Sequence, residues 1–170
     1  MSNPLAAALQ ISWKRNGAYG VRLIEDLRPD QMVAQPPGLP KGISMNHPAW
    51  IMCHLNLYAE IAVNLALARA FEDPAEHRFG ARSVPVPDVG AYDRKDRMAA
   101  RWREWHEAGE SALAAASVEL TSRPNPLERW RTLHPTIGDM LMTLMVKHES
   151  GHLGQLSAWR RACALPSVPM

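Results

Sequence analysis

Two histidines one helical turn apart are the residues whose type and spacing point most directly to chemistry in this sequence. His148 and His152 occupy positions i and i+4, with Glu149 directly after the first of them. On a helix this spacing places two imidazoles on one face, where they can share a metal ion. Apolar residues at helical spacing flank the pair, and two buried rings without a metal would need partners for four ring nitrogens. The pair therefore predicts a metal site.

The segment from His148 to His152 also matches H-E-x-x-H, the pattern of zinc metalloproteases, in which the glutamate acts as general base on a metal-bound water. Such enzymes take a third ligand from downstream, but the 18 residues after His152 contain no Asp, Glu or His. Gln155 and Ala158 stand where the metzincin motif has a glycine and its third histidine. The sequence disfavours a protease and requires an upstream ligand, while Glu149 stays a candidate catalytic base.

His54 is the best upstream candidate for the third ligand. It lies in the middle of an apolar stripe on another predicted helix, with Trp50 and Tyr58 one turn away on either side. Two facing helices of a bundle can together build such a site. His47 lies on the same face but precedes Pro48, which places it outside the helix or at its cap. The sequence therefore predicts a triad of His54, His148 and His152.

The remaining histidines and the cysteines fit the site less well. We expect His134 to cap the last helix, and Cys53, rotated about 100° from the predicted ligand beside it, to pack as a small apolar residue. His77 falls in a long connection and His106 among charged residues.

Three histidine ligands would leave at least one coordination position open, which is the catalytic rather than the structural arrangement of zinc. Neutral imidazoles suit nickel, copper and iron as well as zinc. Tyr58 could donate a hydrogen bond to a bound ligand or cofactor, and Gln155 could orient it. Each of these two residues could equally be structural.

The elements that must position these residues are four predicted helices: about 4–27, 48–71, 92–120 and 135–164. Pro48 stands where a proline favours the start of a helix. The connection over residues 72–90 is long enough to cross a bundle, so the second and third helices need not be antiparallel neighbours. No strand-like alternation competes with this pattern. We predict a single all-α domain over residues 1–170, a four-helix bundle with a long crossover between helices two and three.

Composition excludes several classes of function. The formal net charge is +2, and the basic residues are scattered rather than gathered into the patch or stripe of a nucleic-acid binder. No apolar run approaches the roughly 20 residues that a membrane span requires, and the N-terminal segment does not resemble a secretory signal. We therefore expect a cytoplasmic protein that binds neither nucleic acid nor membranes.

The block from Pro135 to Arg161 resembles the last helix of the DinB-like superfamily, and the segment from His47 to Leu55 resembles its second helix. The resemblance implies a four-helix bundle of up-down-down-up order. It also implies a divalent metal bound by three histidines, which correspond here to His54, His148 and His152. Members are often homodimers, and characterised relatives include metal-dependent transferases and isomerases that use a low-molecular-weight thiol such as bacillithiol, mycothiol or glutathione.

The sequence thus supports one leading hypothesis and two rivals. The leading one is a divalent-metal enzyme, with zinc or nickel, that holds a low-molecular-weight thiol against a small electrophilic substrate. One rival is a metal-dependent hydrolase with Glu149 as base, and the other is a non-catalytic metal-binding protein associated with stress. A second apolar line on the last helix, formed by Met142, Val146 and Leu153, could pack within the chain or mediate homodimerisation.

Overall fold

The computed structural model describes residues 3–170 and is all-helical in its long elements. The long elements are α1 (Pro4–Glu25), α2 (Pro48–Ala66), α3 (Lys95–Ala115) and a last helix composed of α5 (Ile137–Met142), η5 (Thr143–His148) and α6 (Glu149–Ala162). The short elements are α4 (Val118–Ser122) and the 3₁₀ turns η1 (Gln31–Val33), η2 (Pro74–Glu76), η3 (Val89–Ala91) and η4 (Glu128–Trp130). The predicted all-α class is confirmed, with α4 as an additional helix.

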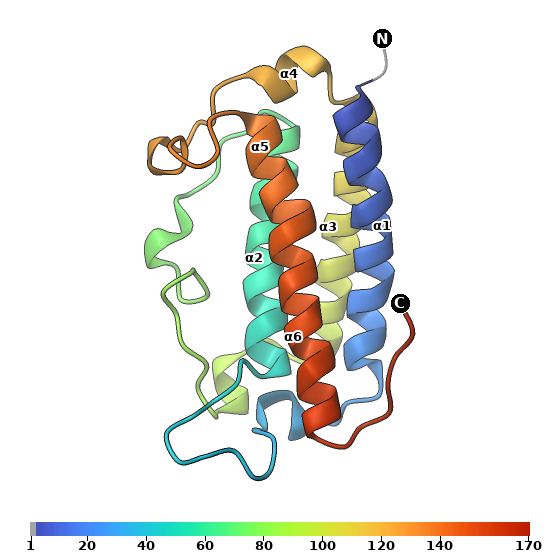
Figure 1. The fold of residues 1–170 in the computed structure, drawn as a ribbon, viewed down its shortest axis with the longest axis vertical. Helices are drawn as coiled ribbons and strands as arrows, with labels where there is room; N and C mark the ends of the chain where they lie inside the picture. The colour runs from blue at the N-terminus through green and yellow to red at the C-terminus, as the bar shows by residue number, and fades with distance from the viewer. Residues whose placement is uncertain (1–2) are drawn as a thin grey trace.

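The four long segments lie side by side, and the connection between α2 and α3 runs along the outside of α2 for most of its length (Figure 1). In Figure 1, α1 and the last helix run downward, whereas α2 and α3 both run upward. The long connection makes this possible, since it returns the chain to the end of the molecule where α2 began. The histidines of α2 and of the last helix are thereby carried on adjacent helices.

The helix boundaries follow local signals, and two of them differ from those predicted. Pro48 occupies the first turn of α2, as predicted, but α2 ends five residues early because the chain turns at Ala68, which has a φ of 53°. The predicted third helix is divided at Ala116, whose extended backbone ends α3 before Ser117 caps α4.

The start of the last helix also differs from the prediction. The last helix is capped by Thr136 through a capping box with Asp139. His134 is not the cap; its Nδ1 lies 3.2 Å from the Thr143 hydroxyl instead.

The last helix is interrupted by a π-helical segment that ends at the predicted metal ligand His148. Residues Thr143–His148 are π-helical, between the α-helical segments α5 and α6. A π-turn accommodates one residue more than an α-turn, so residues after it are rotated by about 100° relative to a continuous α-helix. The interruption therefore sets the direction in which His148 and His152 point.

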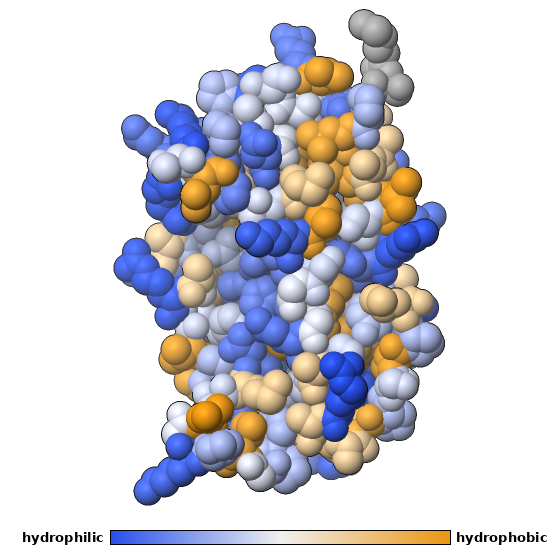
Figure 2. Space-filling model, viewed as in Figure 1, coloured by the Kyte–Doolittle hydropathy of each residue, from blue (hydrophilic) through white to orange (hydrophobic). Residues whose placement is uncertain are grey.

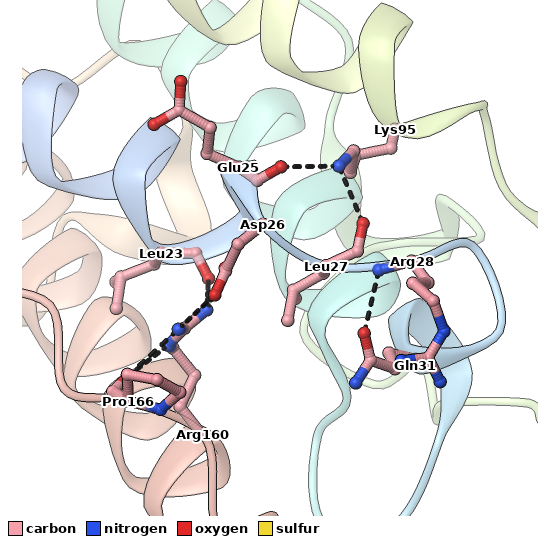
Figure 3. Close-up of polar contacts among 9 residues, drawn as sticks. All are labelled: Leu23, Glu25, Asp26, Leu27, Arg28, Gln31, Lys95, Arg160 and Pro166. Carbon is pink, nitrogen blue, oxygen red and sulfur yellow. Dashed lines mark hydrogen bonds and ion pairs between the residues drawn. The ribbon is translucent and has the colours of Figure 1, made fainter.

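Two polar clamps hold the lower ends of the helices together (Figure 3). The buried Arg160 guanidinium forms a two-pronged ion pair with Asp26 at 2.6 and 2.8 Å and donates to the carbonyl oxygens of Leu23 and Pro166. Lys95 Nζ, at the start of α3, donates to the carbonyl oxygens of Glu25 and Leu27 at 2.7 Å each. The first clamp ties the end of α6 to the end of α1, and the second satisfies carbonyls at the end of α1.

On the face of the molecule shown in Figure 2, hydrophilic residues gather over the middle of α2 and the last helix, while apolar residues lie mainly toward the upper part of α1. Within residues 3–170, none of the helices combines the length and the apolar character needed to cross a bilayer.

Candidate metal centre

The three histidines predicted as ligands come together between α2 and the last helix. One side-chain nitrogen from each of His54, His148 and His152 lies within 4.8 Å of the other two. The Nε2 atoms of His54 and His148 are 2.9 Å apart. Two such nitrogens can both contact one ion at the Zn–N distance of about 2.0–2.1 Å that imidazole ligands favour. The predicted triad is thus brought together.

His54 is oriented by the long connection. Its Nδ1 lies 2.7 Å from the carbonyl oxygen of Phe79. A carbonyl oxygen only accepts, so Nδ1 carries the proton, and the lone pair of a neutral His54 is on Nε2. The Trp50 indole stacks on the imidazole at a centroid distance of 4.6 Å. The ring therefore presents a free lone pair toward His148, as metal-ligating histidines with a carbonyl partner do.

His152 is oriented in the same way by a side chain one turn further along α6. Its Nδ1 lies 3.1 Å from Gln155 Oε1, and that oxygen also accepts from Asn46 Nδ2 at 3.0 Å. Because Gln155 Oε1 is an acceptor, the Nδ1 of His152 must donate to it. The lone pair of a neutral His152 is therefore on Nε2. Gln155 therefore lies where the sequence placed it, next to a ligand.

His148 differs from the other two ligands. Its Nδ1 is buried and has no hydrogen-bond partner among the described residues, while its Nε2 faces His54. Two ring nitrogens at 2.9 Å require either a shared proton or a shared cation between them. The donor set is therefore suited to a metal, which would occupy the lone pairs of both rings at once.

Burial keeps the three imidazoles neutral, which is the form that binds metal. Desolvation lowers the pKa of His54 to about 4 and that of His148 to about 3, with the neighbouring His152 adding to both effects. Desolvation also lowers the pKa of His152 itself. Neutral imidazoles at physiological pH are available as ligands without first losing a proton.

Tyr58 forms one wall of the site. Its ring lies 4.8 Å from that of His54 and 4.7 Å from that of His148, measured between centroids. Burial raises the pKa of its phenol, so the hydroxyl stays protonated at neutral pH. The predicted position beside the ligands is thus observed, and Tyr58 can donate a hydrogen bond.

Glu149 does not join the triad, contrary to its predicted role as a base at the metal. Its carboxylate is buried against α3, where Oε1 lies 3.3 Å from His106 Nε2. The reason is helix geometry, because consecutive residues point about 100° apart and His148 already faces α2. Burial raises the pKa of Glu149, and the hydrogen bond from His106 opposes that rise.

His106 was expected among solvated charges, yet it is only 5% exposed. Its Nδ1 donates to the Trp102 carbonyl oxygen at 2.9 Å, and its ring stacks on Trp13 at 4.1 Å. The misleading signal was the charged neighbours of His106 in sequence, which lie on other faces of α3.

The other candidates lie outside the site. His47 caps α2 as predicted, with Nδ1 accepting from the Trp50 backbone, and it donates from Nε2 to the Val86 carbonyl oxygen. Cys53 packs as a buried thiol against Met98, and desolvation raises its pKa to about 11. His77 lies in the long connection, where its Nδ1 accepts from the Phe79 backbone.

Three residues that orient the ligands or the helix were missed from the sequence: Phe79, Asn46 and Asn16. Phe79 acts through its carbonyl oxygen, a group that every residue carries, so no sequence signal marks it. Asn46 is a loop residue 109 positions from Gln155, and Asn16 lies on α1. Only the tertiary structure brings them to the last helix.

Comparison with known families agrees with this site. The family model described as the DinB superfamily matches residues 13–156, which include α2, α3, the triad and Gln155. Searches of curated proteins and of solved structures found no match.

Proposed function

Because the chain belongs to the DinB superfamily and brings three neutral imidazoles together, we propose that it binds a divalent metal ion through His54, His148 and His152. The convergence of three ligand atoms within 4.8 Å, from two helices, is the observation that carries the proposal. The hydrogen bonds on His54 and His152 support it, since both leave Nε2 free. Zinc and nickel both suit three imidazoles.

We further propose a metal-dependent transferase or isomerase that uses a low-molecular-weight thiol. Three protein ligands leave room for an exogenous ligand, and a bound divalent ion lowers the pKa of a coordinated thiol. The protein ligands are neutral, so the double charge of the ion remains available to a thiolate. The Tyr58 ring, with its neutral phenol, packs beside the triad, and Gln155 holds His152 in place.

The hydrolase alternative has less support because the triad has no carboxylate beside it among the residues that gather there. A general base must lie within hydrogen-bond reach of the water it activates. Glu149, the acid nearest in sequence, is buried against His106 instead. A non-catalytic metal-binding protein is the remaining alternative, and the thiol experiment below separates it from a transferase.

The proposal extends to assembly and location. We infer that the four long segments form the up-down-down-up bundle of a single domain over residues 1–170, in a cytoplasmic homodimer that acts on a small molecule. The second apolar line of the last helix is mostly covered within the chain, because Leu153 is 1% exposed and only Met142 is largely open, at 41%. Small-angle scattering at micromolar concentration tests the dimer, and a monomer mass would rule it out.

Elemental analysis of the protein as purified tests the metal site. We expect about one equivalent of zinc or nickel in the wild type and a large loss in His54→Ala. His134→Ala is the matched control, since it removes a histidine that lies outside the triad. Equal metal content in all three proteins would exclude the triad as the site.

Thiol addition tests the activity. A cobalt-substituted site should change its visible spectrum when glutathione, bacillithiol or mycothiol is added, and monochlorobimane should be conjugated faster with the protein than without it. If no thiol perturbs the spectrum or accelerates conjugation, while metal content is normal, the non-catalytic alternative is favoured.

A further inference from the structure

A polar cluster on a neighbouring face of the last helix has no role in the site as described so far. It consists of Glu149, His106 and Asn16. Glu149 is 2% exposed and directly follows the ligand His148. Burying a carboxylate costs free energy unless the carboxylate is paired and hydrogen-bonded. Glu149 must therefore stay next to its partner, and a rigid partner fixes the position of the last helix.

The partner of Glu149 is rigidly held. His106 lies between two indoles at centroid distances of 4.1 Å to each, stacked on Trp13 and tilted by 42° against Trp102. The two indoles are anchored in turn, since Trp13 donates to the His106 carbonyl oxygen and Trp102 donates to the Gly17 carbonyl oxygen. His106 therefore has little freedom to follow Glu149 if the last helix turns or slides.

Asn16 holds the other side of the junction between η5 and α6. Its Nδ2 lies 3.1 Å from Ser150 Oγ, at the start of α6, and 3.5 Å from the Met145 carbonyl oxygen, inside the π-helical segment. It also lies near enough to Glu149 to lower the pKa of that carboxyl, against the larger effect of burial. One side chain of α1 thus contacts residues on both sides of the junction between η5 and α6. Side chains that insert into the helical hydrogen-bond ladder are a known cause of such irregularities.

The two faces of the helix are geometrically linked. Counting 100° per residue, His148 and His152 lie about 100° and 60° from Glu149, both to the same side. A rotation of the helix that displaced the carboxylate would swing both imidazoles away from His54, whose own ring is fixed by Phe79.

We propose that Glu149, held by His106 and Asn16, is a positioning residue that fixes the rotation of the last helix and so aims His148 and His152 at His54. This inference rests on the metal-binding part of the proposed function and not on the thiol reaction. Residues that orient metal ligands at one remove typically change metal affinity by 10- to 100-fold.

Two substitutions at Glu149 test the proposal. Glu149→Leu removes the pairing and should weaken cobalt or zinc affinity by about 10- to 100-fold and alter the visible spectrum of the cobalt protein. Glu149→Gln should restore both, because a glutamine side chain has the length of glutamate and carries an amide oxygen and an amide nitrogen, one of which can pair with His106 Nε2. Affinity is measured by competition with a chromophoric chelator.

Arg160→Met provides the matched structural control. Arg160 also ties the last helix to α1 through a buried polar contact, but it lies 12 residues after His148. This variant should melt at a lower temperature while its metal affinity and cobalt spectrum stay those of the wild type. Equal weakening in Arg160→Met and Glu149→Leu would overturn the proposal, as would a Glu149→Leu protein with wild-type affinity and spectrum.

If Glu149→Leu does not fold, Asn16→Ala takes its place, with an expected loss of affinity of about 3- to 10-fold, at or below the lower end of that range. Unchanged affinity in Asn16→Ala would then reject the inference. Failure of the wild type to bind any metal would instead refute the proposed function itself and with it this inference.

Discussion

The last helix carries buried polar residues on two faces, and the two faces differ in how their hydrogen bonds are satisfied. Toward α1 and α3, Glu149 and His106 are paired, and His106 uses both ring nitrogens within the protein. Toward α2, the Nε2 atoms of His54 and His148 face each other, and His148 Nδ1 has no partner among residues 3–170. Both faces contain buried histidine, but only the second has lone pairs to offer.

The difference shows that burial alone does not make a histidine a ligand. What separates the triad from His106 is the direction of its free lone pairs, which a partner at Nδ1 determines for His54 and His152. Phe79 and Gln155 accept from Nδ1 and so turn Nε2 of their histidines toward the site. His106, by contrast, has a carboxylate at Nε2 and a carbonyl at Nδ1, and it has no capacity left for a metal.

The largest expected effect separates the two faces directly. His148→Ala removes the imidazole whose Nε2 lies 2.9 Å from that of His54 and should lower metal affinity by more than about 100-fold, beyond what residues at one remove from a metal typically cause. His106→Gln, on the opposite face, should retain at least a tenth of the wild-type affinity. Isothermal titration with zinc measures both, and comparable losses in the two variants would erase the distinction between the faces.

Much of this comparison could be predicted from the sequence. The i, i+4 spacing of His148 and His152 and the apolar stripe around His54 depend on helical periodicity alone, so the sequence could predict that these three histidines come together. Predicting the position of Glu149 would also have required knowledge of which helix packs against each face of the last helix.

The remainder could not be predicted because it depends on tertiary contacts and on one irregularity. A continuous α-helix was assumed across the π-helical segment Thr143–His148, and no proline or glycine within that segment marks the change. The environment of His106 could not be predicted from its charged neighbours, because those residues lie on the solvent-facing side of α3. The burial of His106 depends on Trp13, which α1 contributes. The role of the Phe79 carbonyl depends on backbone position and leaves no trace in residue type.

The pH dependence of the metal-free protein should reveal the second-largest effect. Unfolded histidines titrate near pH 6.5, whereas the pKa is about 4 for His54 and about 3 for His148 in the folded chain. Between these values the unfolded state binds more protons, so the free energy of unfolding should fall as the pH drops from about 6.5 toward 4, by an amount on the order of a few kcal/mol.

Urea unfolding at a series of pH values measures this slope. The double variant His54→Leu, His148→Leu lacks both groups and should show a distinctly shallower dependence over the same range. An identical slope in the double variant would mean that the folded triad already takes up protons near pH 6.5. The face toward α2 would then have no free lone pairs that distinguish it from the face toward α3.

A smaller effect is expected from the residue that orients His152. Gln155→Ala removes the oxygen that accepts from Nδ1, which leaves the ring free to change tautomer and to rotate. Metal affinity should fall by about tenfold, the lower end of the range for such residues, because Gln155 is exposed and water can replace its oxygen. Gln155→Glu should retain the wild-type affinity, since its carboxylate accepts the same hydrogen bond, and a loss as large as in Gln155→Ala would show that acceptance is not what the site needs.

The smallest effects come from two glycine substitutions, one against the His106 ring and one at an open position of the last helix. A Cβ on Gly17 would lie 2.4 Å from His106 Cδ2, a ring that is held from both faces and cannot retreat, so Gly17→Ala should destabilise the protein by about 1–3 kcal/mol. Gly151, between the two ligands of α6, has nothing within 4 Å of an added Cβ. Gly151→Ala should therefore stabilise by about 0.5–1 kcal/mol through helix propensity alone. Thermal unfolding of the two variants should shift in opposite directions. If both variants melted at a higher temperature, the packing of Trp13 and Trp102 around His106 would have to accommodate an added methyl group. That packing would then be too soft to fix Glu149 and orient His148.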